Sequence, residues 1–258
     1  MTVYAYLDKN VKGNNTQQLM SKVPHIDIPL REGLVLPSDA ELISVHGVKR
    51  GNDTLIQQAT QTNTPWLYMD NGYFGKYKRV VVNATAPITF REGRRFEHNT
   101  ELKPWRGGQG EHIIVLPPSY PYMDTFGCHD FLNHVAHNVN LYTDRDVIIR
   151  AKPAKGRIAK PWEEQIENAY AVITWGSALA LDAMIRGVPT ISLGWCPGAN
   201  ASFKLKDLDT TVVTNEPDRM GTLDNLTWSS FERDELPNAY DLALENFQIK
   251  DKITTGLL

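Results

Sequence analysis

The sequence predicts an α/β fold made of two small Rossmann-like halves that face a cleft. Two series of short apolar runs alternate with helical segments, and a polar stretch rich in Arg, Glu, Gly and Asn separates them at residues 87–110. With 258 residues and 41% hydrophobic content, the chain is long enough for two small domains. We expect an N-terminal half at 1–104, a C-terminal half at 105–230 and a helical tail at 231–258. A single continuous doubly wound sheet is the alternative.

The first series consists mostly of short strands. Its apolar, β-favouring runs end at polar residues, and one intervening segment has helical spacing. We expect strands at 3–7, 41–46, 65–69 and 79–83, and a helix at 53–61.

The second series alternates strands and helices more regularly. Gly187 ends its last helix, and Val188 and Pro189 open a further strand. The strands are expected at 113–116, 147–150 and 171–174, and the helices at 130–139 and 178–186. Further helical segments are expected at 223–230 and 234–247.

Composition excludes several classes of protein. The formal net charge of −3 gives no global basic field, so any contact with nucleic acid must come from a local patch. Cys128 and Cys196 lie far apart and fit neither a metal-ligand spacing nor a disulfide framework, which favours a reducing compartment. The N-terminus lacks a basic region followed by an apolar stretch, and no apolar run approaches the length of a membrane span. We therefore expect a cytoplasmic protein without a membrane partner.

The turn at residues 175–177 has the composition of an anion site. A short apolar, β-favouring run leads into Trp175-Gly176-Ser177, and a segment of helical composition follows directly. The free N–H groups of that helix, its positive dipole end and the Ser177 hydroxyl would face the carboxyl edge of the sheet. An ordinary βαβ unit in which a serine caps the helix is the alternative.

Two other strand ends would meet this turn if the sheet is parallel. Ser119 follows the strand at 113–116, and Arg150 and Lys152 follow the strand at 147–150. Cations, hydroxyls and oriented N–H groups together suit a phosphate monoester or a diphosphate. The sequence thus predicts a phosphate site at this edge. Taken alone, Arg150 and Lys152 would be solvated residues at a strand end.

The segment 171–194 resembles the donor-binding segment of GT-B glycosyltransferases, especially those that build bacterial capsule polysaccharide. The matching residues are Thr174, Ser177, Asp182, Gly187 and Pro189. The resemblance implies a compact GT-B-like fold and a nucleotide-sugar donor. In many such enzymes a glutamate at the position of Asp182 binds the ribose, and aspartate is one methylene shorter. The alternative is an exposed helix residue favoured by the dipole.

Residues 66–74 resemble a strand-end acidic segment of the capsule-type enzymes, with Asp70 in the acidic place. Other short patches are similar to glycosyltransferases encoded by tailed phages. The phage-type patches are at 76–83, 104–106, 116–119, 149–153 and 216–219. If the protein is phage-encoded, its location would be the host cytoplasm.

The resemblance also implies a mechanism. GT-B enzymes typically use no metal to bridge the diphosphate, so Ser177, Arg150 and Lys152 would stabilise the leaving charge. We expect no metal and no cofactor beyond the nucleotide-sugar co-substrate. Asp70 is the preferred base and His46 the second candidate, because both lie at predicted strand ends. A turn-capping aspartate and a core histidine are the alternatives.

The acceptor is less well defined by the sequence. Tyr73, Lys76, Lys78 and Arg79 form a basic, aromatic stretch that would contact phosphates, which favours hydroxymethylpyrimidine in phage DNA. A glycan of the capsule type is the next candidate. A nucleotide-sugar epimerase and a non-catalytic protein that binds nucleotide-sugars or nucleic acid are the remaining alternatives.

Two further patterns do not predict metal sites. Asp144-Arg145-Asp146 has the D-x-D spacing of metal–nucleotide sites but lies in a polar, loop-like stretch, so solvated turn carboxylates are the interpretation. His134 and His137 have no accompanying H-E-x-x-H pattern and are interpreted as exposed helical histidines.

Overall fold

The computed structural model describes residues 3–7, 26–29, 35–48, 51–87, 91–152, 161–209, 211–236, 238–239 and 242. The chain forms two compact units. The first comprises Met1–Arg91, Asp124–Gly127 and Leu226–Leu258, and the second comprises Glu92–Met123 and Cys128–Asn225. Each unit contains its own sheet, which confirms the predicted α/β class with two Rossmann-like halves.

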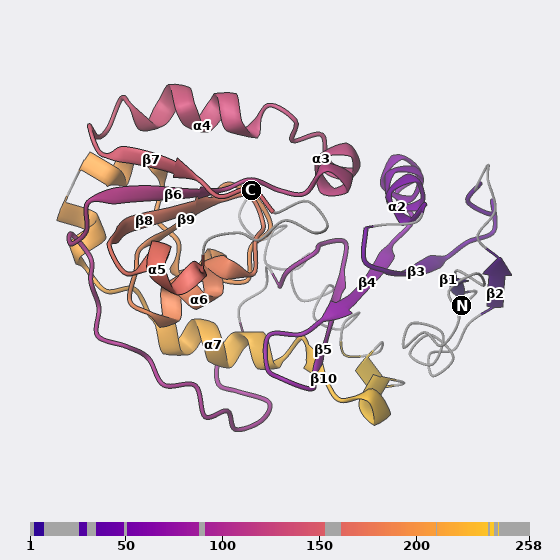
Figure 1. The fold of residues 1–258 in the computed structure, drawn as a ribbon. Helices are drawn as coiled ribbons and strands as arrows, with labels where there is room; N and C mark the ends of the chain where they lie inside the picture. The colour runs from indigo at the N-terminus through magenta and orange to yellow at the C-terminus, as the bar shows by residue number, and fades with distance from the viewer. Residues whose placement is uncertain are drawn as a thin grey trace, which may run out of the picture. The chain divides into compact units, whose positions relative to one another are not determined.

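The first unit is built on a six-stranded sheet with the order β10-β5-β4-β3-β1-β2 (Figure 1). Neighbours among β1, β2, β3 and β4 pair in parallel, whereas β5 pairs antiparallel with β4 and β10 pairs antiparallel with β5. The strands are β1 (Val3–Leu7), β2 (Ile26–Pro29), β3 (Leu42–His46), β4 (Trp66–Asn71), β5 (Lys78–Val82) and β10 (Ser230–Phe231).

Helix α2 (Asn52–Gln61) connects β3 to β4 and contributes to the core of this unit. Gly51 adopts a left-handed conformation just before the helix begins. The Asn52 side chain then donates to the carbonyls of His46 and Gly47, at 3.0 and 3.1 Å, and so fixes the chain at the end of β3. Leu55, Ile56 and Ala59 are buried. Helix α2 therefore forms where the sequence predicts a helix.

The second unit is built on a four-stranded parallel sheet with the order β7-β6-β8-β9. Helix α4 covers one face, and α5 and α6 lie on the other (Figure 1). The strands are β6 (His112–Leu116), β7 (Asp146–Ile149), β8 (Ala169–Thr174) and β9 (Thr190–Ser192). The helices are α3 (Tyr120–Phe126), α4 (Phe131–Val139), α5 (Trp162–Ile166), α6 (Leu179–Ile185) and α7 (Arg219–Thr227), of which α3 and α7 extend into the first unit. The 3-10 helices are η1 (Ala199–Ala201), η2 (Leu205–Asp209) and η3 (Thr211–Thr214) here, and η4 (Arg233–Glu235) in the first unit.

Two apolar clusters fill the faces of the second sheet. Alternate residues of β6 point to opposite faces, as the pleat requires. Ile113 and Val115 pack with Phe131 and Val135 of α4. Ile114 and Leu116 pack with Trp162 of α5 on the other face. This two-sided burial explains why β6 and β8 read as continuous apolar runs in the sequence.

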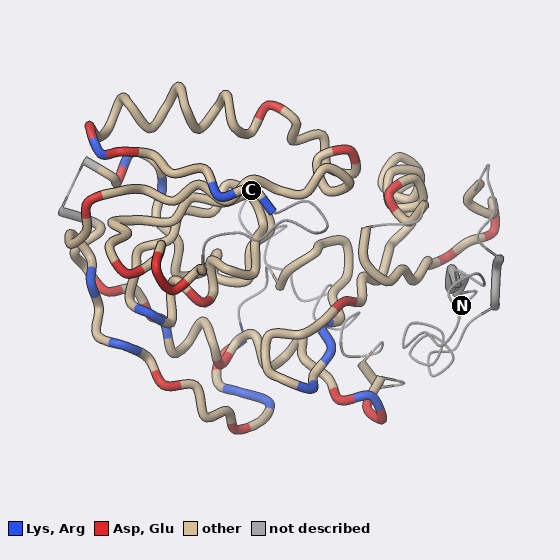
Figure 2. Tube along the Cα trace, viewed as in Figure 1, with Lys and Arg blue, Asp and Glu red and all other residues tan. Residues whose placement is uncertain are grey.

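Several elements differ from those the sequence predicts. Ser230, expected at the end of a helix, lies in β10. Helices α3 and α5 and strand β2 had no predicted counterpart. Much of the expected helix at 234–247 lies outside the described residues. The connector at 91–110 contains no helix or strand, and basic and acidic residues alternate along it (Figure 2).

Candidate functional site

The carboxyl ends of β6, β7 and β8 lie at the same edge of the second sheet, because the three strands are parallel neighbours. Ser119 follows β6 by three residues, Arg150 and Lys152 follow β7, and Gly176 and Ser177 follow β8. The structure therefore brings these residues to one edge, as the sequence predicts. Their roles in binding remain predictions.

This edge contains a topological switch point. The chain passes from β6 outward to β7, crosses back to β8 and then continues outward to β9 on the opposite side. Accordingly, α4 and α6 lie on opposite faces of the sheet (Figure 1). The loops after β6 and β8 therefore diverge to opposite faces. Open α/β sheets bind their ligands at this position.

Thr174 organises the turn at the switch point. Its buried Oγ1 donates to the carbonyl of Leu116 at 3.1 Å and accepts from the backbone N of Ser177 at 3.0 Å. The ends of β6 and β8 are thereby joined by one side chain. Ser177 Oγ accepts from the backbone N of Leu179 at 3.2 Å, where α6 begins, and its hydroxyl proton is left to donate elsewhere.

Gly176 lies where two other segments approach the turn. A Cβ at this position would be 2.7 Å from the carbonyl oxygen of Trp195 and 3.0 Å from Tyr122 Oη. Cys196 Sγ contacts the carbonyl of Ser177 at 3.7 Å. The loop after β9 and helix α3 therefore pack directly against residues 176–177. Only glycine allows this approach without displacing one of them.

Helix α5 orients two of the predicted donor residues. Arg150 Nη1 donates to Gln165 Oε1, and its guanidinium lies over the ring of Trp162, 5.6 Å from the centroid. Asp182 accepts from Trp162 Nε1 and, at 2.7 Å, from Arg186 Nε. Lys152 is exposed. Arg150 is thus held in place beside the edge, whereas Asp182 is already engaged by α5 and by its own helix.

The preferred candidate base, Asp70, lies in the first unit near the end of β4, together with the predicted acceptor residues. Asp70 Oδ2 accepts from Tyr68 Oη at 2.8 Å and from Arg79 Nη2 at 3.1 Å, and Oδ1 accepts from the backbone N of Asn71 at 2.8 Å. Burial alone would raise the pKa of this carboxyl. The charge of Arg79 and the hydrogen bonds from Asn71 and Tyr68 outweigh burial, so the pKa is lowered below its ordinary value.

Arg79 is nearly buried, with 13% of its side chain exposed. Its Nη1 donates to Tyr73 Oη at 2.8 Å, and its guanidinium lies 5.2 Å from the ring centroids of both Tyr68 and Tyr73. Burial disfavours the charged form, but the surrounding tyrosines and Asp70 raise the pKa of Arg79 overall. Arg79 is therefore a fixed counter-ion of Asp70.

The residues of the basic stretch that was predicted to bind the acceptor contact different partners. Tyr73 and Arg79 join Asp70, as described above. Lys76 forms an ion pair with Glu232 at 2.7 Å, and Lys78 Nζ donates to Asn71 Oδ1 at 2.7 Å. Adjacent residues of a strand point to opposite faces, so Lys78 and Arg79 do not form one continuous cationic track.

His46 is the last residue of β3 and lies beside Met69 of β4 in the sheet register. It is close enough to Asp70 for its positive charge to lower the pKa of that carboxyl. The structure thus places both predicted bases at neighbouring ends of parallel strands.

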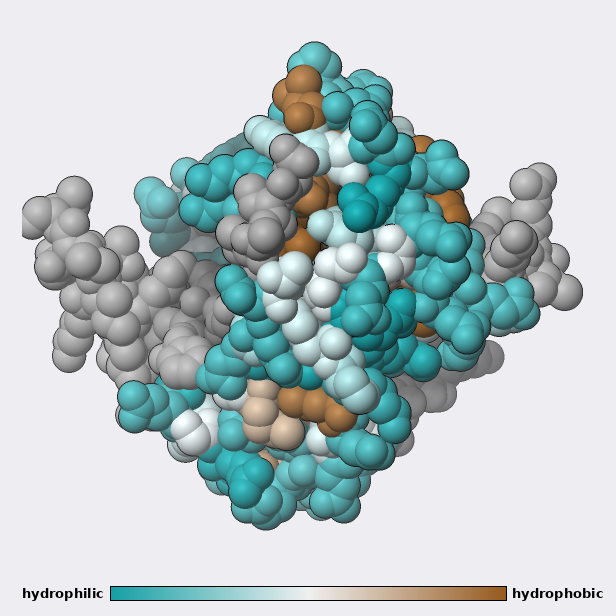
Figure 3. All heavy atoms as spheres, turned by 90° about the vertical axis from the view of Figure 1, so that its left-hand side faces the viewer, coloured by the Kyte–Doolittle hydropathy of each residue, from teal (hydrophilic) through white to brown (hydrophobic). Residues whose placement is uncertain are grey.

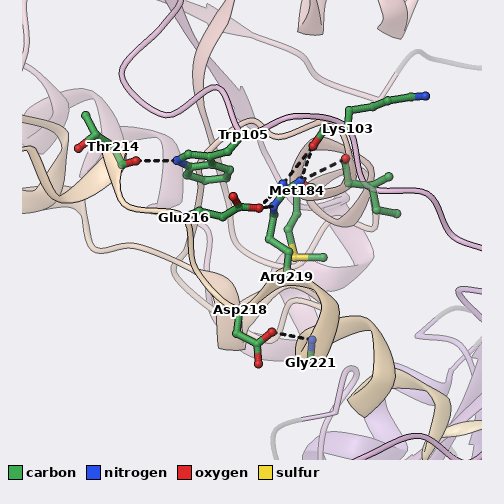
Figure 4. A network of polar contacts seen from close by, with 9 residues as sticks. Lys103, Trp105, Met184, Thr214, Glu216, Asp218, Arg219 and Gly221 are labelled. Carbon is green, nitrogen blue, oxygen red and sulfur yellow. Dashed lines mark hydrogen bonds and ion pairs between the residues drawn. The ribbon is translucent and has the colours of Figure 1, made fainter.

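Arg219 forms a buried network of hydrogen bonds whose partners the sequence did not reveal (Figure 4). It is 3% exposed and donates to the carbonyls of Lys103, Met184 and Ile185 and to the carboxylate of Glu216. Asp218, just before α7, accepts from the backbone N of Gly221 at 2.8 Å. The Arg219 network joins the connector to the end of α6, away from the carboxyl edge. The motif 216–219 was visible in the sequence, but its long-range partners were not.

The predicted helical histidines, His134 and His137, both lie in α4, and Asn138 donates to the carbonyl of His134 at 2.7 Å. Within the described ranges, no group of three or more His, Cys, Asp or Glu side chains is arranged to hold a metal ion. No helix in the described part of the chain combines the length and the apolar character needed to cross a bilayer.

Comparison with protein-family models and with curated proteins finds no match. Among solved structures, the chain is similar to KpsC of Thermosulfurimonas dismutans, a beta Kdo 2,4 transferase. The TM-score is 0.43 at 11% sequence identity, and the similarity covers 87% of this chain and 90% of that chain.

Proposed function

We propose that the protein is a glycosyltransferase that moves a sugar from a nucleotide-sugar donor to an acceptor hydroxyl. The observation that carries the proposal is the switch point of the second sheet, where Ser119, Arg150, Lys152, Gly176 and Ser177 follow parallel strands that end at one edge. The resemblance of segment 171–194 to donor-binding segments supports the same assignment.

The reaction places negative charge on the leaving diphosphate. As the acceptor oxygen bonds to the anomeric carbon, the bond from that carbon to the diphosphate oxygen breaks and its electron pair remains with the diphosphate. We assign the stabilisation of this charge to Arg150, Lys152 and the Ser177 hydroxyl, without a bridging metal. The contacts of Arg150 with Gln165 and Trp162 hold its guanidinium before the donor binds, which lowers the cost of ordering it.

The acceptor hydroxyl must lose its proton, and we assign this proton to Asp70. Oδ2 already accepts two hydrogen bonds, whereas Oδ1 accepts one from Asn71 and retains capacity for the acceptor hydroxyl. The lowered pKa keeps Asp70 ionised at neutral pH but makes it a weak base. His46, at the neighbouring strand end, is the second candidate base.

A glycan hydroxyl is the acceptor that we propose. Phosphate contacts with DNA require cations that are available to it. Arg79 is paired with Asp70 and Lys76 with Glu232, so two cations of the predicted track carry carboxylate partners. This pairing favours an acceptor without a phosphate backbone over hydroxymethylpyrimidine in duplex DNA.

Ligand-induced thermal stabilisation tests the donor site directly, because a ligand that binds only the folded state raises the melting temperature. We expect stabilisation by a nucleoside diphosphate or a nucleotide-sugar from a panel of bases and sugars. Arg150→Ala and Ser177→Ala should each weaken binding, Arg150→Ala by about 10-fold to 100-fold because a charged hydrogen bond is lost.

Lys206→Ala is the matched control. Lys206 is exposed in η2. Leu208 of the same helix accepts a hydrogen bond from Tyr170, near the amino end of β8, whereas the proposed donor site lies at the carboxyl end of that strand. This variant should bind as the wild type does. If Arg150→Ala and Ser177→Ala also bind unchanged, the donor site is wrongly placed. If no nucleotide of the panel stabilises the wild type, the proposed function is wrong.

A further inference from the structure

Strand β7 lies at one edge of the second sheet and exposes apolar side chains there. It pairs with β6 on one side and is the last strand in the order of the described sheet. Val147 is 38% exposed and Ile149 is 57% exposed. An exposed edge strand with β-branched residues is a template for pairing with another strand.

The register determines which backbone groups of β7 face outward. The backbone N of Arg150 donates to the carbonyl of Val115 in β6 at 2.8 Å. In a parallel ladder, the backbone groups of alternate residues point to the same neighbour. Residues 146, 148 and 150 therefore bond toward β6, and the N–H and C=O groups of Val147 and Ile149 point away from the sheet.

The sequence around β7 is complementary to itself when it is read in the opposite direction about Ile148. Asp144 and Asp146 are four and two residues before Ile148, with Arg145 between them, and Arg150 and Lys152 are two and four residues after it. An antiparallel copy centred on Ile148 sets Asp146 opposite Arg150, Asp144 opposite Lys152, and Val147 opposite Ile149. The outward backbone groups of Val147 and Ile149 then meet each other, as an antiparallel hydrogen-bonded pair requires.

We propose that two copies of this chain dimerise through β7, with antiparallel pairing about a two-fold axis through Ile148. The two sheets would join into one continuous sheet. The dimer is inferred from the edge strand and its flanking charges, and in it Arg150 and Lys152, the two cations of the proposed donor site, also face carboxylates of the second copy.

Both faces of the joined sheet support this register. Val147 and Ile149 lie on the face of Ile113 and Val115, their partners in β6, so they form apolar cross-strand pairs on the α4 face. The charged pairs lie on the other face, where Arg150 contacts α5. Opposite charges directly across an antiparallel pair stabilise it.

The same charges act against parallel pairing of two β7 strands. Parallel, in-register stacking would set Asp144 and Asp146 against the same residues of the next copy, and Arg150 against Arg150. Like charges directly opposite each other are destabilising. A two-fold pair also uses one edge of each sheet and closes on itself. The charge pattern thus favours the antiparallel pair over the parallel one.

Disulfide cross-linking tests the register. At the two-fold axis, Ile148 meets its own copy in a non-hydrogen-bonded pair with Cα atoms about 4.5 Å apart, which a disulfide spans. The Cα atoms of the two Ile149 residues would be about 9 Å apart, beyond disulfide reach. Under mild oxidation, Ile148→Cys should form a covalent dimer and Ile149→Cys should not. The native Cys128 and Cys196 are buried and free, which keeps the background low.

Charge reversal tests the charge complementarity without a covalent cross-link. Asp144→Lys and Lys152→Asp should each raise the dimer dissociation constant about tenfold in sedimentation velocity, because two symmetry-related pairs become repulsive at once. The double variant Asp144→Lys/Lys152→Asp restores opposite charges and should recover the wild-type constant. Glu164→Lys, at an exposed position of α5, is the control and should leave it unchanged.

A wild type that stays monomeric over the whole concentration series would overturn the proposal. A dimer that is insensitive to both single reversals, or one that Ile149→Cys cross-links as well as Ile148→Cys, would exclude this register and overturn it too.

Discussion

The ion pair between Asp70 and Arg79 makes the most specific energetic prediction. Asp70→Asn keeps the shape of the side chain but removes the charge that faces Arg79 at 3.1 Å. The guanidinium would then stay 13% exposed among two tyrosine rings without its counter-ion. Breaking a fully buried pair costs about 3–5 kcal/mol, but Asp70 is partly exposed, so we expect a loss of about 2–3 kcal/mol in the free energy of unfolding.

A double-mutant cycle separates the pair from its surroundings. Arg79→Met removes the charge and retains an apolar side chain of similar length. The double variant Asp70→Asn/Arg79→Met should be less destabilised than the sum of the single variants, because no buried charge is left unpaired. Urea denaturation at neutral pH measures all four free energies. We expect a coupling of about 1–2 kcal/mol.

The pH dependence gives a second readout of the same pair. The folded-state pKa of Asp70 is lowered from 3.8, so its ionised form stabilises the fold above that unfolded-state value. This contribution is lost as the pH falls through the lower folded-state pKa. The difference between wild type and Asp70→Asn should therefore be constant at neutral and mildly acidic pH and should shrink below 3.8.

Lys78→Met is the matched control for the cycle. Lys78 is the neighbouring cation on β5, but it contacts Asn71 and not Asp70. Its coupling to Asp70→Asn should stay below about 0.5 kcal/mol, as for other exposed pairs. If Arg79→Met couples to Asp70→Asn no more strongly than Lys78→Met does, Arg79 is not the counter-ion that holds Asp70.

Three further predictions concern the second unit. Arg219→Lys should lower the free energy of unfolding by about 2–4 kcal/mol in urea denaturation, because a lysine cannot supply the fork of donors that Lys103, Met184, Ile185 and Glu216 accept. Gly187→Ala should lower it by at least about 2 kcal/mol in the same assay, since a Cβ would lie 2.0 Å from the Pro104 carbonyl at a φ of +79°. Burial raises the pKa of Cys196 to about 11, so its reaction with a thiol reagent at mildly alkaline pH should be slow in the native protein and become fast in urea. Rapid labelling of native Cys196 would show that the loop after β9 opens readily.

The sequence predicted the strands well where burial on both faces produces a continuous apolar run. β6 and β8 are such strands, and Thr174 and Gly176 marked the end of β8 because strand and turn compositions meet there. Short elements were missed because their stability comes from distant partners. β10 has two residues and exists through pairing with β5, and α3 begins with Tyr-Pro-Tyr, a pattern that also fits a turn.

The sequence could not reveal which cations are already paired. Lys76, Lys78 and Arg79 read as one basic stretch because they are close in sequence. The antiparallel register of β4 and β5 sets Arg79 opposite Asp70, and Glu232, which is far along the chain but belongs to the same unit, pairs with Lys76. Register and long-range ion pairs are properties of the tertiary fold. The spacing of Lys76, Lys78 and Arg79 in the sequence does not show which carboxylates they pair with.

The two edges of the second sheet carry different residues, and this difference supports the position of the proposed donor site. At the amino edge, the end of α6 is fixed by the Arg219 network, and the surface on that side is mainly hydrophilic with small, separate apolar groups (Figure 3). At the carboxyl edge, Ser177 lies in the turn that precedes the same short helix, and its hydroxyl proton is left to donate. The hydrogen bonds from Arg219 to the carbonyls of Met184 and Ile185 oppose a shift of this helix along its axis. The turn at Ser177 is therefore ordered by its own contacts, as the proposed donor site requires.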